Sequence, residues 1–449
     1  MQIVNLKDIG LTKAQELLQK PPFDEVELSP KIKALNKELF GEDLSAEEIV
    51  HKIVAAVRKD GDKALIHYTE LIDKLTLNPE TIKVRGAEIE AAYQKADQAV
   101  VAALKEAAAN IQSYHQEQKP KSFLTYRGSG SIIGQSLIPL ERVGIYVPGG
   151  TAAYPSSVLM NAVPAKVAGV KEIVMVVPAR NGEINPYVLI AADIAGVTDI
   201  YKIGGAQAIA ALAFGTDTIP KVDKITGPGN IFVTLAKKAV YGHVDIDMLA
   251  GPSEILILAD HSADAVYTAA DMLSQAEHDP LASSILITTS NELALNVRQE
   301  LQVQLAKLPR REIAQSSLDN NGLIIIADNL EDAILLANTS APEHMELLVE
   351  NPFSILPKIK HAGAIFLGHY SPEPLGDYFA GPNHVLPTGG TARFYSVLNV
   401  ETFMKRTSII SYTEEDLLAK SDTIIRLAEA EGLVAHANAI RVRQGEEDV

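Results

Sequence analysis

The chain contains no cysteine and no tryptophan among its 449 residues. Without cysteine it can form no disulfide, thiolate zinc site or iron–sulfur cluster, and it has no cysteine nucleophile. Any metal must therefore be held by histidine, carboxylate or amide groups. Aromatic residues make up only 5% of the chain, so Ala, Ile, Leu and Val must do most of the packing in its core.

Basic residues are also scarce relative to acidic ones. The chain has 40 Lys and Arg against 57 Asp and Glu, a formal net charge of −17. This balance argues against a broad nucleic-acid surface, for which a basic patch is expected. It suits a soluble protein with small-molecule partners.

Targeting and membrane signals are absent from the sequence. The segment Met1–Asp8 has no basic start followed by an apolar core, so we expect no signal peptide. No apolar run approaches the ~20 residues of a membrane span. The expected location is the cytoplasm.

The period of the hydrophobic pattern changes along the chain. Residues 1–115 look mostly helical, and residues 116–136 are polar and rich in Gly and Ser, typical of a connection. Two series of short apolar runs follow, with helix-like segments between them. Asn185 before Pro186, for example, predicts a helix start that leads into Tyr187–Ala195. The predicted strands are Val143–Val147, Ile173–Val177, Ile200–Ile203 and Val222–Thr226, then Glu254–Ala259, Ser284–Thr289, Leu323–Ala327 and Ala364–Leu367.

Strands that alternate with helices predict βαβ units and parallel sheets. The predicted fold class is therefore α/β. From Thr391 onward the pattern again favours helices, and Thr413-Glu414-Glu415-Asp416 resembles a capping box. A length of 449 residues suggests about three domains.

Three strands of the first series end in glycine-rich turns. These are Tyr146-Val147-Pro148-Gly149-Gly150, Gly204-Gly205-Ala206-Gln207 and Thr226-Gly227-Pro228-Gly229-Asn230. Glycine simply turns a strand into a helix in many proteins, and none of the three is the GxGxxG fingerprint. Three in one series nevertheless favour a ligand crevice at the carboxyl ends of the strands. Tyr146, Gln207 and Asn230 are the polar side chains best placed to line it.

Ionisable motifs occur mainly in the second half of the chain. Gln275 and His278 project from one side of a last helical turn, as metal ligands or as an ordinary helix end with a histidine near the dipole. Glu343 and His344 follow Pro342 on irregular backbone, where His344 suits proton transfer near neutral pH; a polar helix–strand junction explains them equally well.

Glu431 and His436 close the set of ionisable motifs. On one continuous helix, five positions would separate them by about 140°. Gly432 is predicted to end one helix and start another, which frees this geometry. In isolation the pair is typical of a solvated helix end. The other histidines have no comparable neighbours and are interpreted as surface or core residues; they are His51, His67, His115, His243, His261, His361 and His369.

One irregular segment stands apart from these helices and strands. Residues 374–390 hold four Gly and three Pro together with Asp377, Asn383 and His384. This composition excludes a regular helix or a central strand. An irregular loop that carries an acid, an amide and an imidazole is more often a site than a spacer.

Taken together, these motifs resemble the histidinol dehydrogenase family over nearly the whole chain. Any one of them is weak, whereas eight in the same order are specific. They are the three glycine turns, Ala250-Gly251-Pro252-Ser253-Glu254, Gln275-Ala276-Glu277-His278-Asp279, Ala341-Pro342-Glu343-His344, the loop of residues 374–390, and Glu431-Gly432-Leu433-Val434-Ala435-His436.

The resemblance implies an activity and a set of residue roles. The family oxidises L-histidinol through L-histidinaldehyde to L-histidine with two NAD, in the last step of histidine biosynthesis. One zinc per subunit would be held by Gln275, His278, Asp377 and His436. His344 would be the general base of the oxidations, and Glu343 would help to activate water. NAD would contact Tyr146, Gln207 and Asn230. Substrate contacts are implied at Ser253, Gln275, His278, His344, Asp377, His384, Glu431 and His436.

The resemblance also implies an assembly and a division into domains. The family forms a homodimer in which Glu431 and His436 complete the partner's site. Two Rossmann-like domains are expected, with helical segments at each end. The expected parts are an N-terminal helical arm at residues 1–25, a metal and catalytic domain at 26–140 plus 250–392, an NAD-binding domain at 141–249, and a C-terminal segment at 393–449.

Three other functions remain open on the sequence alone. A dehydrogenase of the same fold could act on another amino or hydroxy alcohol, although Glu431 and His384 favour histidinol. A zinc hydrolase could use Glu343 as a base, but the glycine turns would then have no role. A non-catalytic nucleotide-binding module would leave the ionisable motifs unexplained.

Overall fold

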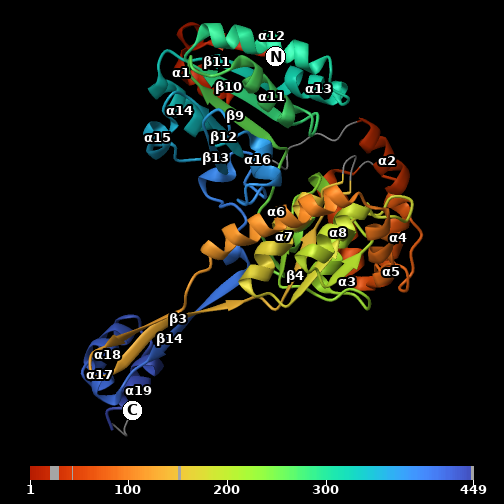
Figure 1. Ribbon diagram of the computed structural model, residues 1–449. Coiled ribbons are helices and arrows are strands. Elements are labelled where there is room, and N and C mark those ends of the chain that lie inside the picture. The colour runs from red at the N-terminus through yellow and green to blue at the C-terminus, as the bar shows by residue number, and fades with distance from the viewer. Residues whose placement is uncertain (21–29, 43, 150–152, 446–449) are drawn as a thin grey trace. The chain divides into compact units, whose positions relative to one another are not determined.

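The computed structural model describes residues 1–20, 30–42, 44–149 and 153–445 (Figure 1). The chain forms two compact units. Unit 1 comprises Met1–Gln118 and Leu140–Phe403, and unit 2 comprises Lys119–Pro139 and Met404–Val449. Within the described ranges, every helix is too short or too polar to cross a lipid bilayer.

Unit 1 contains a six-stranded sheet in which all neighbouring strands run parallel. Its strands, in spatial order, are β1 (Gln2–Asn5), β11 (Gly322–Ile326), β10 (Ser283–Thr288), β9 (Glu254–Ala259), β12 (His344–Leu348) and β13 (Ala364–Leu367). After the edge strand β1, the chain re-enters the sheet at β9, winds outward through β10 and β11, and returns to the other side of β9 as β12. This reversal makes the sheet doubly wound, with its switch point between β9 and β12.

Both faces of this sheet are buried, which explains the unbroken apolar runs of its strands. On β9, Leu256 and Leu258 face one hydrophobic cluster, whereas Ile255 and Ile257 face the other. The helical segments of this part of the chain are α1 (Leu6–Leu17), α11 (Ala265–Ala276), α12 (Asn291–Leu305), α13 (Arg311–Asn321), α14 (Leu330–Ser340), α15 (Pro352–Ile355) and α16 (Glu373–Tyr378), with short 3₁₀ turns at Leu356–Lys358, Thr391–Arg393 and Val400–Phe403.

A second, five-stranded sheet in unit 1 is also entirely parallel. Its spatial order is β6 (Asp199–Tyr201), β5 (Glu172–Val176), β4 (Arg142–Tyr146), β7 (Lys224–Thr226) and β8 (Asp245–Ile246). The helices of this region are α2 (Pro30–Phe40), α3 (Ala46–Asp60), α4 (Asp62–Asp73), α5 (Gly86–Lys95), α6 (Gln98–Glu117), α7 (Pro155–Ala168), α8 (Pro186–Ala195), α9 (Gly205–Phe214) and α10 (Ile231–Val240).

The α/β fold class with two open parallel sheets is thus confirmed. All eight predicted strands exist, with ends displaced by at most two residues. Asn185 caps α8 as expected, since its side chain accepts a hydrogen bond from the backbone N of Tyr187.

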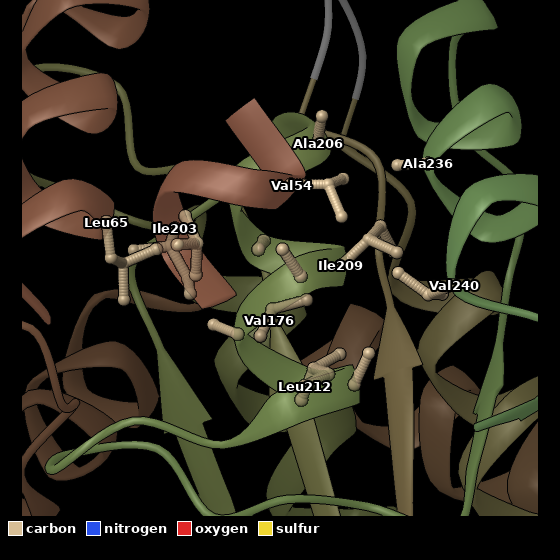
Figure 2. Close-up of a cluster of buried hydrophobic side chains, with 14 of the residues drawn as sticks. Val54, Leu65, Val176, Ile203, Ala206, Ile209, Leu212, Ala236 and Val240 are labelled. Atoms are coloured by element: carbon tan, nitrogen blue, oxygen red, sulfur yellow. The ribbon is translucent and has the colours of Figure 1, made fainter. Parts of the chain in front are cut away.

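The division of unit 1 differs from the expected one. Helices α3 and α4 share a hydrophobic cluster with α9, α10 and the five-stranded sheet, as Figure 2 shows for Val54, Leu65, Val176 and Ile209. Residues 46–73 thus pack with the predicted NAD-binding part rather than with residues 250–392, because the apolar stripe of α3 fits that sheet's helices. The N-terminal segment also begins with a strand, β1, which pairs with β11. The expected boundary at residues 25 and 26 lies outside the described residues.

Unit 2 corrects two further expectations. Residues 116–136 were expected to be a connection, and residues from Thr391 onward to be helical. Instead, β2 (Phe123–Arg127), β3 (Ser131–Pro139) and β14 (Met404–Ser411) form an antiparallel sheet in the order β14-β3-β2. Strands β2 and β14 are largely exposed and β3 is mostly half-buried, so no fully buried face imposes an apolar pattern on their sequence. The helices of unit 2 are α17 (Glu414–Leu418), α18 (Ser421–Ala430) and α19 (Val434–Arg441).

The predicted capping box at Thr413 is half formed. The Thr413 side chain accepts from the backbone N of Asp416 at 3.3 Å. The Asp416 carboxylate accepts from the Thr413 hydroxyl at 3.2 Å but not from the Thr413 backbone N, which a full capping box requires and which donates to the Ser131 hydroxyl. The carboxylate also accepts from the backbone N atoms of Ser129 and Ser131 and from the Ser131 hydroxyl. Asp416 therefore ties α17 to the turn between β2 and β3.

A buried ion pair fixes the third glycine turn. Lys237 on α10 pairs with Asp247, and both side chains are almost fully buried. Lys237 Nζ also donates to the Gly227 carbonyl at 3.0 Å, and Asp247 Oδ2 accepts from the Gly227 N at 2.8 Å. Gly227 has a φ of 108°, and a Cβ there would meet the Tyr146 carbonyl oxygen at 2.1 Å. The Lys237–Asp247 pair thus forms hydrogen bonds with both the carbonyl and the N of Gly227. No residue other than glycine fits at this position.

We expect Lys237→Met to lower the thermal unfolding midpoint markedly, because it leaves Asp247 buried without its cation, a loss of about 3–5 kcal/mol. The matched control is Lys238→Met, since Lys238 is 41% exposed and lies 3.7 Å from an exposed Glu47. Pairs of that kind contribute about 0–1 kcal/mol. Differential scanning calorimetry of the two variants checks this, and equal midpoints would contradict the importance of the buried pair.

Candidate active site

The ionisable residues gather at the switch point of the six-stranded sheet. His344 begins β12, and β12 pairs directly with β9, which begins at Glu254. Glu343 and His344 therefore lie at the amino end of β12, beside Glu254 at the amino end of the adjacent β9. Ligands in open α/β sheets usually bind at the carboxyl ends, so this site uses the opposite edge.

Backbone atoms of Glu254 fix both Glu343 and His344. The Glu254 N donates to Glu343 Oε2 at 2.8 Å, and the Glu254 carbonyl lies 3.0 Å from His344 Nδ1. Because a carbonyl only accepts, Nδ1 carries a hydrogen. The other ring nitrogen, Nε2, is buried, has no hydrogen-bond partner among the described residues, and lies 3.8 Å from Asp377 Oδ1. It is the ring atom available to a ligand.

Burial and charge set the protonation of this pair. Burial raises the pKa of Glu343 to about 7. Burial alone would lower the pKa of His344, but the carboxylates of Glu343 and Asp377 outweigh it and raise the pKa to about 10. A cation bound at Asp377 would oppose this rise, since a bound ion dominates the local charge.

A group suited to a metal ion lies beside His344. One ligand atom each from His278, Glu373 and Asp377 lie within 4.8 Å of one another. Burial lowers the pKa of His278, which keeps its imidazole in the neutral, metal-binding form. Burial would raise the pKa of Asp377, but His384 and His344 lower it below its usual range and keep it ionised.

Gln275 supports the same interpretation. It lies one residue before the end of α11, and His278 follows in the turn. Its side chain is fully buried, yet neither Oε1 nor Nε2 has a hydrogen-bond partner within the described part of the chain. An unpaired buried amide is costly, and a ligand at this point would satisfy it. The donor set therefore fits a divalent cation held by nitrogen and oxygen.

The loop of residues 374–390 is anchored by Asn383. Asn383 Nδ2 donates to the Met160 carbonyl on α7 at 2.6 Å and lies 3.4 Å from Nε2 of the buried His115 on α6. The neighbouring His384 lies 3.1 Å through Nδ1 from the Asp377 carbonyl and 3.2 Å through Nε2 from the Ser157 hydroxyl. The loop thus holds His384 against Asp377, and the interpretation of His115 as a core residue is confirmed.

Sequence reasoning missed Glu373 and Glu346. Glu373 stands four residues before Asp377, the spacing that places two side chains on one helix face, and it accepts from the Ser274 hydroxyl at 3.2 Å. Its backbone N donates to the fully buried carboxylate of Glu346 at 2.8 Å. Burial raises the pKa of Glu373 to about 8. An acid within the apolar run Met345–Val349 was the available signal for Glu346.

The three residues expected at the NAD site lie at the carboxyl edge of the five-stranded sheet. The Tyr146 hydroxyl accepts from the Gly205 N at 3.2 Å. Gln207 Nε2 donates to Asp73 Oδ2 at 3.3 Å, a neighbour that the sequence did not suggest. The Asn230 side chain caps α10 by accepting from the N atoms of Phe232 and Val233. Gly150, the last residue of the first turn, lies outside the described residues.

Three predicted substrate contacts remain. Ser253 directly precedes β9 and is half-buried. Glu431 and His436 belong to unit 2, in a different compact unit from the other named residues. Gly432 has a φ of 72° between the ends of α18 and α19, so the predicted helix break is confirmed. Both side chains line a surface depression with Ile424, Leu427, Ala428, Ala435, Ala439 and Ile440.

Comparisons with known proteins agree on one family. The model of the histidinol dehydrogenase family matches residues 39–444. A histidinol dehydrogenase of Carboxydothermus hydrogenoformans is 56% identical over 397 residues, covering 88% of this chain and 93% of the relative. One from Listeria monocytogenes is 54% identical over 422 residues, covering 94% and 98%. The crystal structure of histidinol dehydrogenase from Elizabethkingia anophelis superposes with a TM-score of 0.90 at 39% identity, covering 99% and 98%.

The metal interpretation can be tested without turnover. We expect Zn²⁺ titrated calorimetrically into metal-free protein to bind at one site, and His278→Ala or Asp377→Ala to weaken binding by more than the about 10–100-fold that loss of an outer-shell partner costs. Glu277→Gln, beside His278 but outside the ligand group, is the control and should bind like the unaltered chain. Equal affinity in all four proteins would rule out this site.

Proposed function

The chain belongs to the histidinol dehydrogenase family and is an NAD-dependent dehydrogenase, and from this we propose that it oxidises L-histidinol through L-histidinaldehyde to L-histidine with two NAD, as the last step of histidine biosynthesis. The observation that carries the proposal is that His344 Nε2 lies 3.8 Å from Asp377 Oδ1, and that Asp377 forms a group with His278 and Glu373 that could hold a metal ion. The cytoplasmic location stays a prediction.

Gln275, His278 and Asp377, with His436, would hold one zinc. When bound, zinc supplies no redox chemistry but holds and orients the imidazole and amino nitrogens of the substrate. The unpaired amide of Gln275, the neutral imidazole of His278 and the ionised carboxylate of Asp377 support this assignment. Glu373 lies close enough to join them or to contact the substrate's amino group.

His344 would act as the base in both oxidations. Its Nδ1 hydrogen bond to the Glu254 carbonyl fixes the ring, so that Nε2 faces the side of Asp377. In the first oxidation, Nε2 takes the hydroxyl proton while the carbinol carbon gives a hydride to NAD, leaving the aldehyde. In the second, it takes a proton from the hydrate, which gives its hydride to a second NAD and becomes the acid.

Glu343 would serve the hydration between these oxidations. Water must add to the aldehyde carbon, and its proton must be taken by a base. Burial raises the pKa of Glu343 to about 7, so the group can both accept and release a proton near neutral pH. The Glu254 N holds Oε2 at 2.8 Å and leaves the other oxygen for the water. Ser253, His384 and Glu431 would contact the substrate.

We propose further that the active form is a homodimer with shared sites. Glu431 and His436 are both exposed on unit 2 and border a depression lined mainly by apolar residues. Unit 2 also exposes large apolar side chains, among them Tyr126, Ile410 and Leu427. Exposed apolar surface of this kind is typical of an interface. His436 would complete the metal site of the partner.

The reaction should yield about two NADH per histidinol, because the four-electron oxidation needs two hydride acceptors. The measurement follows NADH absorbance with limiting histidinol and excess NAD, before and after chelation and after zinc is restored. Loss with chelator and recovery with zinc are expected. One NADH per substrate would indicate a simple alcohol dehydrogenase, and no NADH would refute the proposal.

Shared sites predict complementation between two inactive chains. His344→Ala and His436→Ala should each be inactive as homodimers, His344→Ala with its zinc retained. A heterodimer of the two, purified with two different affinity tags, should regain about half of the normal turnover, because one of its two sites is intact if the subunits exchange His436. If each site is built from a single chain, the heterodimer stays inactive.

A further inference from the structure

Three polar side chains converge at the carboxyl edge of the five-stranded sheet. Tyr146 ends β4, Gln207 stands in the first turn of α9, and Asp73 is the last residue of α4. Gln207 Nε2 donates to Asp73 Oδ2 at 3.3 Å, and the Tyr146 hydroxyl accepts from the Gly205 N at 3.2 Å. Burial, together with the nearby Asp73 carboxylate, raises the pKa of Tyr146 to about 12, so its hydroxyl keeps its proton.

Two acceptor groups here can accept further hydrogen bonds: Gln207 Oε1 has no donor within the described residues, and Asp73 accepts one bond through one of its two oxygens. The Asp73 carboxylate fixes the orientation of the Gln207 amide, because only Nε2 can donate to it. Gln207 Oε1 is therefore turned away, and it is buried without a partner among the described residues. Asp73 accepts only the bond from Gln207 within the described ranges, and burial raises its pKa to about 6. The site thus favours a ligand that donates hydrogen bonds.

The local structure does not explain an acid at this place. Asp73 ends α4, where the negative pole of the helix disfavours a carboxylate. Burial adds a second cost that no cation within the described residues offsets. Residues that break local rules without local compensation mark functional sites.

A ribose supplies the missing donors, because its adjacent 2′- and 3′-hydroxyls can each donate to one acceptor. Acidic residues bind this diol in other dinucleotide folds. The catalytic Glu343 and His344 lie on the six-stranded sheet, and they must meet the nicotinamide. The adenosine end is then the part of the cofactor left for the five-stranded sheet.

We propose that Asp73 and Gln207 bind the 2′- and 3′-hydroxyls of the adenosine ribose, and that Asp73 selects NAD over NADP. The proposal rests on the NAD-dependent function given above. A 2′-phosphate removes one hydroxyl donor and adds a charge of about −1.5 to −2. That charge would lie beside the Asp73 carboxylate, so like-charge repulsion excludes NADP.

Binding without histidinol separates this proposal from the activity. Calorimetry with NAD and NADP should show NAD bound at least about 10-fold more tightly, as expected from a hydrogen bond to a charged group. Asp73→Ser should weaken NAD binding and strengthen NADP binding. The ratio of the NADP dissociation constant to the NAD dissociation constant should therefore fall by about 10-fold or more. Asp73→Asn keeps the shape of the side chain and should also narrow the ratio. Asp60→Asn is the matched control, since Asp60 is exposed at the end of the neighbouring α3, and it should leave the ratio unchanged.

Two fragments identify the ribose. The unaltered chain should bind adenosine 5′-monophosphate more tightly than its 2′-deoxy form, and Asp73→Ser should bind the two alike. An unchanged NAD to NADP ratio in both folded Asp73 variants overturns the proposal, even where two NADH per histidinol are formed. The proposal is also overturned if Asp73→Ser loses affinity for nicotinamide mononucleotide but not for adenosine 5′-monophosphate. Asp73 would then contact the nicotinamide ribose and not the adenosine ribose.

Discussion

The parallel pairing of β9 with β12 is the constraint on which the site depends. The backbone N and carbonyl of Glu254, at the start of β9, hold Glu343 and His344 at the start of β12. Since β9 and β12 are both buried on two faces, neither strand can slip without moving its apolar side chains out of register. The positions of Glu343 and His344 are therefore fixed by the packing of the core. Glu254 itself is held by Lys20 and by the Gly389 N at 3.1 Å.

The two sheets present chemically opposite helix ends at opposite edges. The glycine turns lie at the carboxyl edge of the five-stranded sheet, where helices begin and their positive poles favour phosphates. The metal-type group lies at the amino edge of the six-stranded sheet, where α11 ends at Gln275 and His278. A helix C-terminus carries a partial negative charge that favours a cation. The direction of the parallel strands thus places helix N-termini, which favour anions, at one edge and a helix C-terminus, which favours cations, at the other.

Sequence reasoning located most of the strands whose two faces are buried, because such strands read as unbroken apolar runs. It did not list the fully buried β12 as a strand, and it missed β2, β3 and β14, in which no fully buried face imposes a pattern. It proposed Gln275, His278, Glu343, His344 and Asp377 as site residues through motifs and family resemblance, but periodicity could not bring together groups about a hundred positions apart. Only the winding order of the sheet does so. Asp73 was missed for the same reason, since its neighbour Gln207 is far away in the sequence. Glu373 was missed although its four-residue spacing from Asp377 was a local signal.

The buried carboxyl groups around the candidate site destabilise the folded chain locally. Glu343 and Glu373 are buried near Asp377, and Glu346 is buried next to Glu373. Burial raises the pKa of each of these three glutamates. Placing several carboxyl groups together in a low-dielectric interior is unfavourable. His344 and His384 offset part of this charge beside Asp377, and a bound divalent cation would offset more of it. A chain without cysteine has carboxylates, imidazoles and amides for such a site, so the acidic cluster and the metal preference follow from the same composition.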